Sequence, residues 1–516
     1  MALILLLVVP LAAGIGLVVA GRAWSSTTAQ GVAGVAVLAT LALSVVVAAT
    51  RPSVDRAWLP DLGARTSFGV DGISIPLVLL TAFIGVLVVA HVRSEEPEGG
   101  SVATLLGCVL LVVGGALATF TAFDAIIFFV AFEVVLVPMW VLITRFGDSH
   151  RPQARVEAGH RFILYTALGS TLMLVGILLL VASAHTSDLG VLREVGPTLP
   201  RGRQVTIAAL LVVGLAVKVP VFPLHTWLPS AHTIAPTVGS VLLAAVLLKM
   251  GTYGLVRLPL AVVPEGFDAL ATWLALAAAV SIIWGGLVCL VERDLKRLIA
   301  YSSVAHMGFV VLGLASGSEV GLQAALYGNL AHGVISALLF VVVGGLKRRW
   351  GSVDLAKAWP ALREVAPRRG FLLILGLAAA LGLPGLAGFW GEFLAILSAW
   401  SPRRPGQETL FHLCAVLAAI GGLLAAAYSL RVARLLWVGD APAAAVERSN
   451  VAASEGSGAA TSDHSTPVSG VAVEARGVER AVMVVLAVCV VALGLLPWPA
   501  MDVARPAIRL ILGVGP

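Results

Sequence analysis

The sequence predicts an all-α protein that crosses a membrane many times. Of its 516 residues, 59% are hydrophobic and only 12% are charged, and the apolar residues form long continuous runs. Soluble domains average roughly 45–50% apolar and about 25% charged residues. One helical crossing needs roughly 20 apolar residues, and the runs lack the alternation that is typical of a membrane β-barrel. The composition therefore excludes a soluble enzyme and a disordered chain.

About fourteen transmembrane helices are expected, each ending where a charge, a glycine or a proline interrupts an apolar run. The first run has no positively charged start and is longer than that of a signal peptide, so we interpret it as a membrane span. The expected spans are 2–20, 30–50, 73–92, 102–120, 123–144, 161–184, 205–222, 238–257, 267–290, 298–316, 320–345, 370–399, 411–438 and 480–499.

These spans suggest two repeats flanked by smaller segments. Spans four to eight and nine to thirteen are expected to be inverted five-helix repeats, each with a broken fourth helix. A polar stretch over 51–72 predicts a short hairpin on the outer face. The expected segments are 1–101 with the first three helices, 102–257 and 258–439 with the repeats, 440–478 as a disordered cytoplasmic loop, and 479–516 with the last helix and tail.

The distribution of basic residues predicts how the chain is oriented. Loops after odd-numbered spans hold 21 Lys and Arg residues, whereas the other loops and both termini hold 11. Because cytoplasmic loops of membrane proteins are enriched in Lys and Arg, we expect both termini on the outer side. The same bias accounts for the net charge of +6 without any nucleic-acid partner.

Four charged residues are the strongest cases of a charge at membrane depth within the expected spans. They are Glu133, Lys218, Lys249 and Glu392. A charge at the bilayer centre costs about 2.5–3.5 kcal/mol on insertion scales, so each indicates a functional site. A lysine buried beside a movable carboxylate can gain and lose a proton. The alternative is that the acids and bases form static pairs that only hold helices together.

Helix-breaking residues stand beside two of these charges. Pro220 and Pro223 follow Lys218, and Pro384 precedes Glu392. Unwound helices in corresponding positions of two halves are the sequence sign of an ion site in inverted-repeat transporters. The alternative is that proline is simply common in membrane helices.

Histidines add possible proton carriers to the set. His306 and His332 lie within expected spans, while His225 and His232 lie in a stretch without Lys, Arg, Asp or Glu. Buried histidines are often structural, so a relay role and a structural role both stay open. The four cysteines are far apart, and no cluster has the spacing of a metal site.

No motif in the sequence supplies energy. There is no phosphate-binding loop, no dinucleotide-binding glycine motif and no cysteine set for an iron–sulfur cluster. A proton path without an energy source implies either an antiporter or one subunit of a larger machine.

The residues from about 60 to 440 resemble the antiporter-like subunits of complex I, the proton-translocating NADH-quinone oxidoreductase. The most specific element is KVPVFPLHTWLPSAHTIAPTVGSVLLAAVLLKMGTYGLVR, and the segments FFVAFEVVLVPMW, RFILYTALGSTLML, DLKRLIAYSSVAHMGFV and LPGLAGFWGEF occur in the expected order. Glutamate at 392 favours the subunit M branch, since sister subunits and Mrp antiporters usually carry lysine there.

The resemblance implies a role for each candidate residue. Glu133 resembles the carboxylate that modulates the channel lysine Lys218, and Lys249 resembles the residue that passes protons to the far half. Glu392 resembles the terminal protonatable group, and two histidines match those between the half-channels. The implied relay is Glu133, Lys218, Lys249, His306, His332 and Glu392.

The resemblance also implies the setting of the protein. It would bind no cofactor itself, while NADH, FMN, iron–sulfur clusters and quinone would belong to partner subunits in the membrane arm of a bacterial plasma-membrane complex. One departure is that Ser230 and Ile234 replace the acids of the family motif HTWLPDAHTEAPT. An Mrp-type cation/proton antiporter and a structural subunit without transport remain as alternatives.

Overall fold

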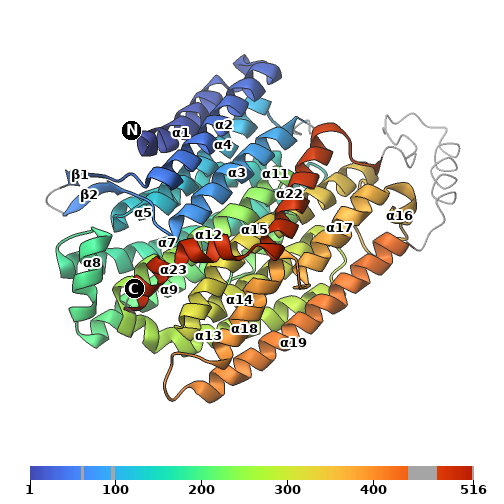
Figure 1. Cartoon of the computed structure of the whole chain (residues 1–516). Helices are drawn as coiled ribbons and strands as arrows, with labels where there is room; N and C mark the ends of the chain where they lie inside the picture. Colours follow the sequence, from blue (N-terminus) through green and yellow to red (C-terminus); the bar gives the residue numbers. More distant parts are fainter. Residues whose placement is uncertain (60–62, 94–98, 440–472, 514–516) are drawn as a thin grey trace, which may run out of the picture.

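The computed structural model describes residues 1–59, 63–93, 99–439 and 473–513. Its long helices run side by side, with α1 and α2 at one edge, α19 at the opposite edge and α15 between them (Figure 1). The first half of the chain forms α1 (Ala2–Ala20), α2 (Ser26–Thr50), α3 (Ser74–Val92), α4 (Val102–Thr121), α5 (Ala125–Val134), α6 (Leu136–Phe146), α7 (Pro152–Ala184), α8 (Leu189–Val195), α9 (Arg201–Lys218) and α10 (Trp227–Ile234).

The next span is one continuous but irregular helix. It comprises α11 (Thr237–Leu242), the π-helical turn η4 (Leu243–Leu247), α12 (Leu248–Leu255) and the π-helical turn η5 (Val256–Leu260). The second half then forms α13 (Pro264–Val291), α14 (Leu295–Ser316), α15 (Glu319–Trp350), α16 (Leu362–Val365), α17 (Pro367–Ala380), α18 (Ala387–Trp400), α19 (Glu408–Val432), the π turn η6 (Ala433–Val438), α22 (Gly477–Leu495) and α23 (Trp498–Leu512).

The multi-pass helical fold is confirmed, with twelve helices among the described residues that are long and apolar enough to cross a membrane. The two expected spans outside this set are the two that were predicted to be broken. In one of them, α9 has 18 residues and begins at Arg201. The other is divided between α17 and α18, with 14 residues each. The count of fourteen and the inverted relation of the repeats stay predictions.

Both helix breaks lie where the sequence placed them. The first, over residues 219–226, is held by the Trp227 indole, which donates to the Val217 carbonyl at 2.9 Å. The second, over residues 381–386, contains Gly382 and Gly385 with φ of 75° and 88°. Positive φ favours glycine because it has no Cβ. Each break therefore has a local cause next to a buried charge.

The irregular span and α15 form the centre of the molecule. In both, every residue of the most apolar stretch is buried inside the protein, whereas only a third is buried in α1, α2 and α19. A side chain in either of these two stretches therefore faces other helices instead of lipid. This is where Lys249 and His332 lie.

Smaller elements cover the expected outer face. Strands β1 (Val54–Leu59) and β2 (Ala64–Phe68) form the predicted hairpin, with Val54 opposite Phe68. The C-terminal helix α23 forms the segment that was expected to be a tail, and it crosses in front of the long helices (Figure 1). Most of the predicted loop over 440–478 lies outside the described residues. At its end, Val473 and Ala475 are buried and α22 already begins at residue 477.

Candidate functional site

Lys249 contacts His332 directly at the centre of the protein. Its ammonium group donates to the Ala244 carbonyl at 2.6 Å and lies 2.6 Å from His332 Nδ1, and the residue has no solvent-exposed surface. The π turn makes the first bond possible, because the Leu248 amide bonds back to Leu243 and not to Ala244. π turns inside α-helices are frequent at functional sites.

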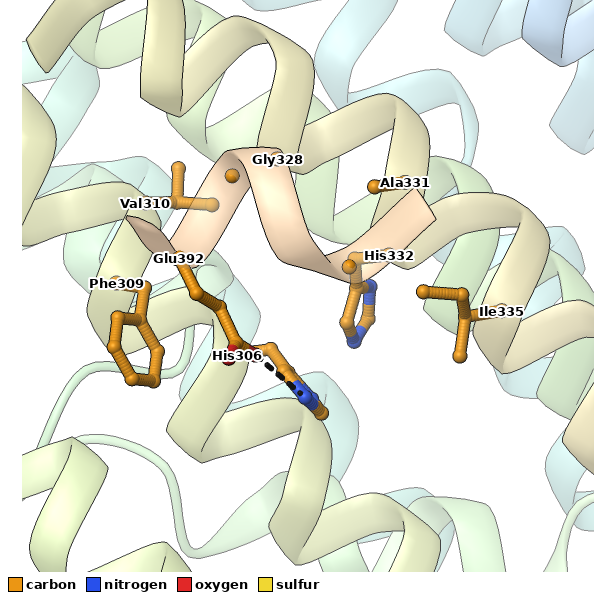
Figure 2. Close-up of a pocket in the computed structure, with 10 residues that line it drawn as sticks. His306, Phe309, Val310, Gly328, Ala331, His332, Ile335 and Glu392 are labelled. Carbon is orange, nitrogen blue, oxygen red and sulfur yellow. Dashed lines mark ion pairs between the residues drawn. The ribbon is translucent and has the colours of Figure 1, made fainter. Parts of the chain in front are cut away.

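The series of contacts continues from His332 to a second histidine, His306, and to an acid, Glu392. The rings of His332 and His306 lie 5.7 Å apart between their centres. His306 Nε2 lies 2.7 Å from the Ala380 carbonyl and 3.2 Å from Glu392 Oε1 (Figure 2). Ala380 is the last residue of α17, and the carbonyls of a final helical turn have no partner within the helix. The helix break thus supplies an acceptor for His306.

A small cavity joins these three side chains. His306 from α14, His332 from α15 and Glu392 from α18 face the same space (Figure 2), which has a volume of about 30 Å³. Glycines and apolar side chains form the rest of its wall. A cavity of about 10–15 Å³ is enough for one water molecule when it has polar partners. The cavity is therefore large enough for at least one water molecule between these three side chains.

Glu133 and Lys218 form a second, looser group. Lys218 is the last residue of α9, where the helix dipole favours a cation, and it is 2% exposed. Its ammonium lies 4.8 Å from the centre of the Phe132 ring and 5.9 Å from that of Phe162. Glu133 on α5 is partly buried and acts on Lys218 through space. Contacts of a cation with aromatic rings contribute about 0.5–2 kcal/mol to its stability.

Static pairing does not describe this arrangement. Glu133 and Lys218, both described, are not joined by an ion pair within 4 Å, and two histidines stand between Lys249 and Glu392. The six predicted residues thus fall into a Glu133–Lys218 group and a Lys249–His332–His306–Glu392 chain. The helix that carries Lys249 packs closely against Lys218, since a Cβ at Gly251 of α12 would meet Val219 and Lys218.

The other two histidines are also buried but lie outside the cavity. His225 stacks on Phe222, with 5.5 Å between ring centres. His232 stacks on Phe340 at 4.5 Å and lies within electrostatic range of Lys249. Aromatic stacking accounts for the position of both rings, which favours the structural role that was left open for them.

Sequence reasoning missed two buried basic residues, because it placed Arg257 at the end of a span and Lys296 in a loop. Arg257 lies inside η5, is 1% exposed and donates to Asp71 at 2.5 Å. Burial raises the pKa of Asp71, but Arg257 and two backbone amides outweigh it and bring that pKa to about 2. Lys296 is 3% exposed and donates to the Ala235 carbonyl at 2.7 Å. The sequence did not reveal that the helix continues past Pro259 to residue 260, which places Arg257 inside the helix.

The two residues that depart from the family motif have ordinary environments. Ser230 accepts a long hydrogen bond of 3.5 Å from Arg161. Ile234 is 5% exposed and packs against Gly147. Neither residue contacts the Lys249–Glu392 chain in the part of the protein that the structure describes, so the loss of two acids leaves that chain unchanged.

Comparison with known proteins gives consistent results. A family described as NADH:quinone oxidoreductase/Mrp antiporter, TM, matches residues 122–421. The chain is 37% identical over 400 residues to the NADH-quinone oxidoreductase subunit M of Rhodobacter capsulatus, covering 75% of this chain and 74% of that one. It is 34% identical over 384 residues to subunit M of Rickettsia bellii, covering 74% of this chain and 75% of the relative.

Solved structures share the fold over almost the whole chain. A chain of respiratory complex I from Thermus thermophilus matches with a TM-score of 0.82 and 26% identity, covering 99% of this chain and 100% of that one. The Mrp complex from Dietzia matches with the same TM-score at 23% identity, covering 100% of this chain and 52% of its own, which shows likeness of fold alone.

Proposed function

Because the chain belongs to the NADH:quinone oxidoreductase/Mrp antiporter transmembrane family, we propose that it is a proton-translocating membrane-arm subunit of an NADH-quinone oxidoreductase. NADH oxidation and quinone reduction take place in partner subunits, which hold the FMN, the iron–sulfur clusters and the quinone. This chain contributes the proton path. The observation that carries the proposal is the buried contact between Lys249 and His332, which continues to His306 and Glu392.

Protons move along this chain of side chains by changes of protonation. Lys249 gives a proton to His332, whose Nδ1 it already contacts. The proton passes through the cavity to His306 and then to Glu392, which lies 3.2 Å from the second ring. The helix break beside Glu392 supports its role, because unwound backbone replaces the hydrogen bonds of a regular helix with local acceptors.

Glu133 controls the first step. A conformational change at the neighbouring subunit moves this carboxylate relative to Lys218. The Lys218 ammonium lies near two aromatic rings and has no ion pair within 4 Å among the described residues. Removing the negative charge from a buried ammonium favours loss of its proton. The released proton then reaches Lys249, whose helix packs against Lys218 at Gly251.

The family and the distribution of basic residues support the following setting for the protein. The partners are other membrane-arm subunits, and the membrane is the bacterial plasma membrane with both termini on the outer side. The two five-helix groups, 102–257 and 258–439, act as inverted repeats around Lys249. Their broken helices, α9–α10 and α17–α18, support this relation because each break adjoins a buried charge.

The test is to purify the chain in mild detergent and identify the subunits that accompany it. Subunits that oxidise NADH are expected, and their absence would contradict the proposal. After reconstitution into vesicles, Lys218→Ala should abolish pumping by this subunit while leaving assembly intact. Full pumping by that variant would also overturn the assignment of Lys218.

An Mrp-type cation/proton antiporter is the second candidate, because the description of the matching family includes Mrp antiporters and the Dietzia Mrp complex shares the fold. The two candidates differ in their energy source. Sodium-dependent proton flux in vesicles without NADH would favour the antiporter. NADH-dependent flux without a sodium requirement would favour the membrane-arm subunit.

A further inference from the structure

Arg257 lies on the same helix as Lys249, in a part of the protein that the proton relay does not use. The two residues are eight positions apart, which corresponds to about 12 Å along a helix. Arg257 faces the end of the span near α8 and Asp71, the expected outer side. A proton on Lys249 therefore has two directions to take. One leads to His332, and the second leads directly outward along α12 and η5.

Aromatic side chains fill this second route. We call Phe120, Phe123, Phe128, Tyr253 and Arg257 the outer plug. The Arg257 guanidinium carbon lies 4.9 Å from the centre of the Tyr253 ring and 5.4 Å from that of Phe123. Tyr253 donates to the Phe120 carbonyl at 2.8 Å and packs against the rings of Phe120 and Phe128.

The outer plug is densely packed as well as aromatic. Tyr253 and Phe128 have no exposed surface, and Phe120 and Arg257 are each 1% exposed. Gly254 brings α12 so close to α9 that a Cβ there would overlap with Leu215. A segment that is filled in this way leaves little room for a chain of water molecules, since protein interiors contain few voids of water size.

Positive charge reinforces the packing. Arg257 and Arg193 of α8 lie within electrostatic range of each other, and both act on Asp71. Because the pKa of Asp71 is about 2, this carboxylate stays ionised and does not take up protons at neutral pH. A fixed arginine in a narrow pathway repels hydronium and other cations.

From these observations we infer that the outer plug is a barrier that prevents protons on Lys249 from leaving directly toward the outer side, and prevents outer protons from returning by that route. Arg257 supplies the charge of the barrier. The inference rests on the proposed function, because it assumes that Lys249 carries protons. It explains why a proton on Lys249 continues to His332.

The test measures passive proton leak through the assembled complex in vesicles, under an imposed pH gradient and without NADH. Arg257→Gln should raise the leak about tenfold or more, since a charged cleft changes local ion concentrations by 10- to 1,000-fold. Arg257→Lys should keep the leak at the wild-type level. Asp71→Asn should not raise it, because both arginines remain.

Two further variants separate charge from folding. Arg404→Gln removes another buried arginine that pairs with an acid, Asp268, at the same expected face, and it should leave the leak unchanged. Phe123→Leu makes the outer plug smaller without changing its charge, and it should raise the leak less than Arg257→Gln does. This variant still tests the inference if the Arg257→Gln complex does not assemble.

Several results would overturn the inference. They are an unchanged leak in both Arg257→Gln and Phe123→Leu, an equal rise in Asp71→Asn and Arg257→Gln, or a rise in Arg404→Gln. Because the leak is measured without NADH, failure of NADH-driven pumping would refute the proposed function and not the barrier. The two conclusions are therefore tested separately.

Discussion

His332 is the residue whose replacement tests the relay most sharply. Its Nδ1 is one of two acceptors around the Lys249 ammonium, and the other is the Ala244 carbonyl. His332→Leu removes this acceptor and leaves a buried ammonium with one hydrogen bond. His332→Gln keeps an amide oxygen that can accept the bond but cannot carry a proton onward.

The size of the effect follows from the lost hydrogen bond. A hydrogen bond to a charged group contributes about 1.5–3 kcal/mol. Protonated Lys249 is therefore destabilised by about 2 kcal/mol in His332→Leu, which is on the order of a 30-fold loss of that state. The rate of proton pumping by this subunit should fall by at least this factor, because leucine also cannot carry a proton onward.

The assay is NADH-driven proton uptake by vesicles that contain the assembled complex, divided by the rate of NADH oxidation. A relay role predicts that both variants lose pumping, whereas a positioning role predicts that His332→Gln restores it. His412→Gln is the control, because His412 bonds to the Trp400 carbonyl at the far end of α19. Normal pumping in His332→Gln would refute proton transfer through this ring.

Three other changes give distinct expectations. Glu392→Gln should block pumping but keep assembly, since the amide keeps the shape beside His306 but cannot titrate; pumping at the wild-type ratio of protons to NADH would contradict this. Gly345→Ala should lower stability by about 2 kcal/mol in thermal unfolding, because the new methyl group would overlap with the buried pair Arg369–Glu479; Gly422→Ala, with open space around it, is its control. Asp148→Asn should cost about 1–2 kcal/mol by breaking the 2.7 Å ion pair with Lys347. Burial raises the pKa of Asp148, but Lys347 outweighs this effect and holds the pKa below its usual value. The stabilisation by the ion pair is therefore lost only in acid, and the cost of Asp148→Asn should be equal at pH 6 and pH 8. A cost that changes between these two pH values would contradict this reasoning.

Much of this architecture could be predicted because membrane insertion makes composition informative. Continuous apolar runs predicted the long helices, and proline and glycine beside Lys218 and Glu392 predicted the two breaks. The four buried charges were visible because charges are rare at membrane depth. These features depend on local sequence, so no tertiary information was needed.

Features that depend on tertiary contacts could not be predicted in the same way. The contact between Lys249 and His332 joins residues 83 positions apart. The π turn at Leu243–Leu247, which positions the Ala244 carbonyl, has no proline or glycine to reveal it. Arg257 seemed to end its span because Pro259 follows, but η5 continues past this proline. Packing from neighbouring helices decides each of these.

The central claim is that protons pass through Lys249. Lys249→Met tests it most directly, because methionine nearly preserves the volume of the side chain and removes only its charge and its hydrogen bonds to Ala244 and His332. The measurement is the number of protons pumped per NADH oxidised by the assembled complex in vesicles. The relay predicts a lower ratio than in the wild type at equal assembly, and an unchanged ratio would contradict it.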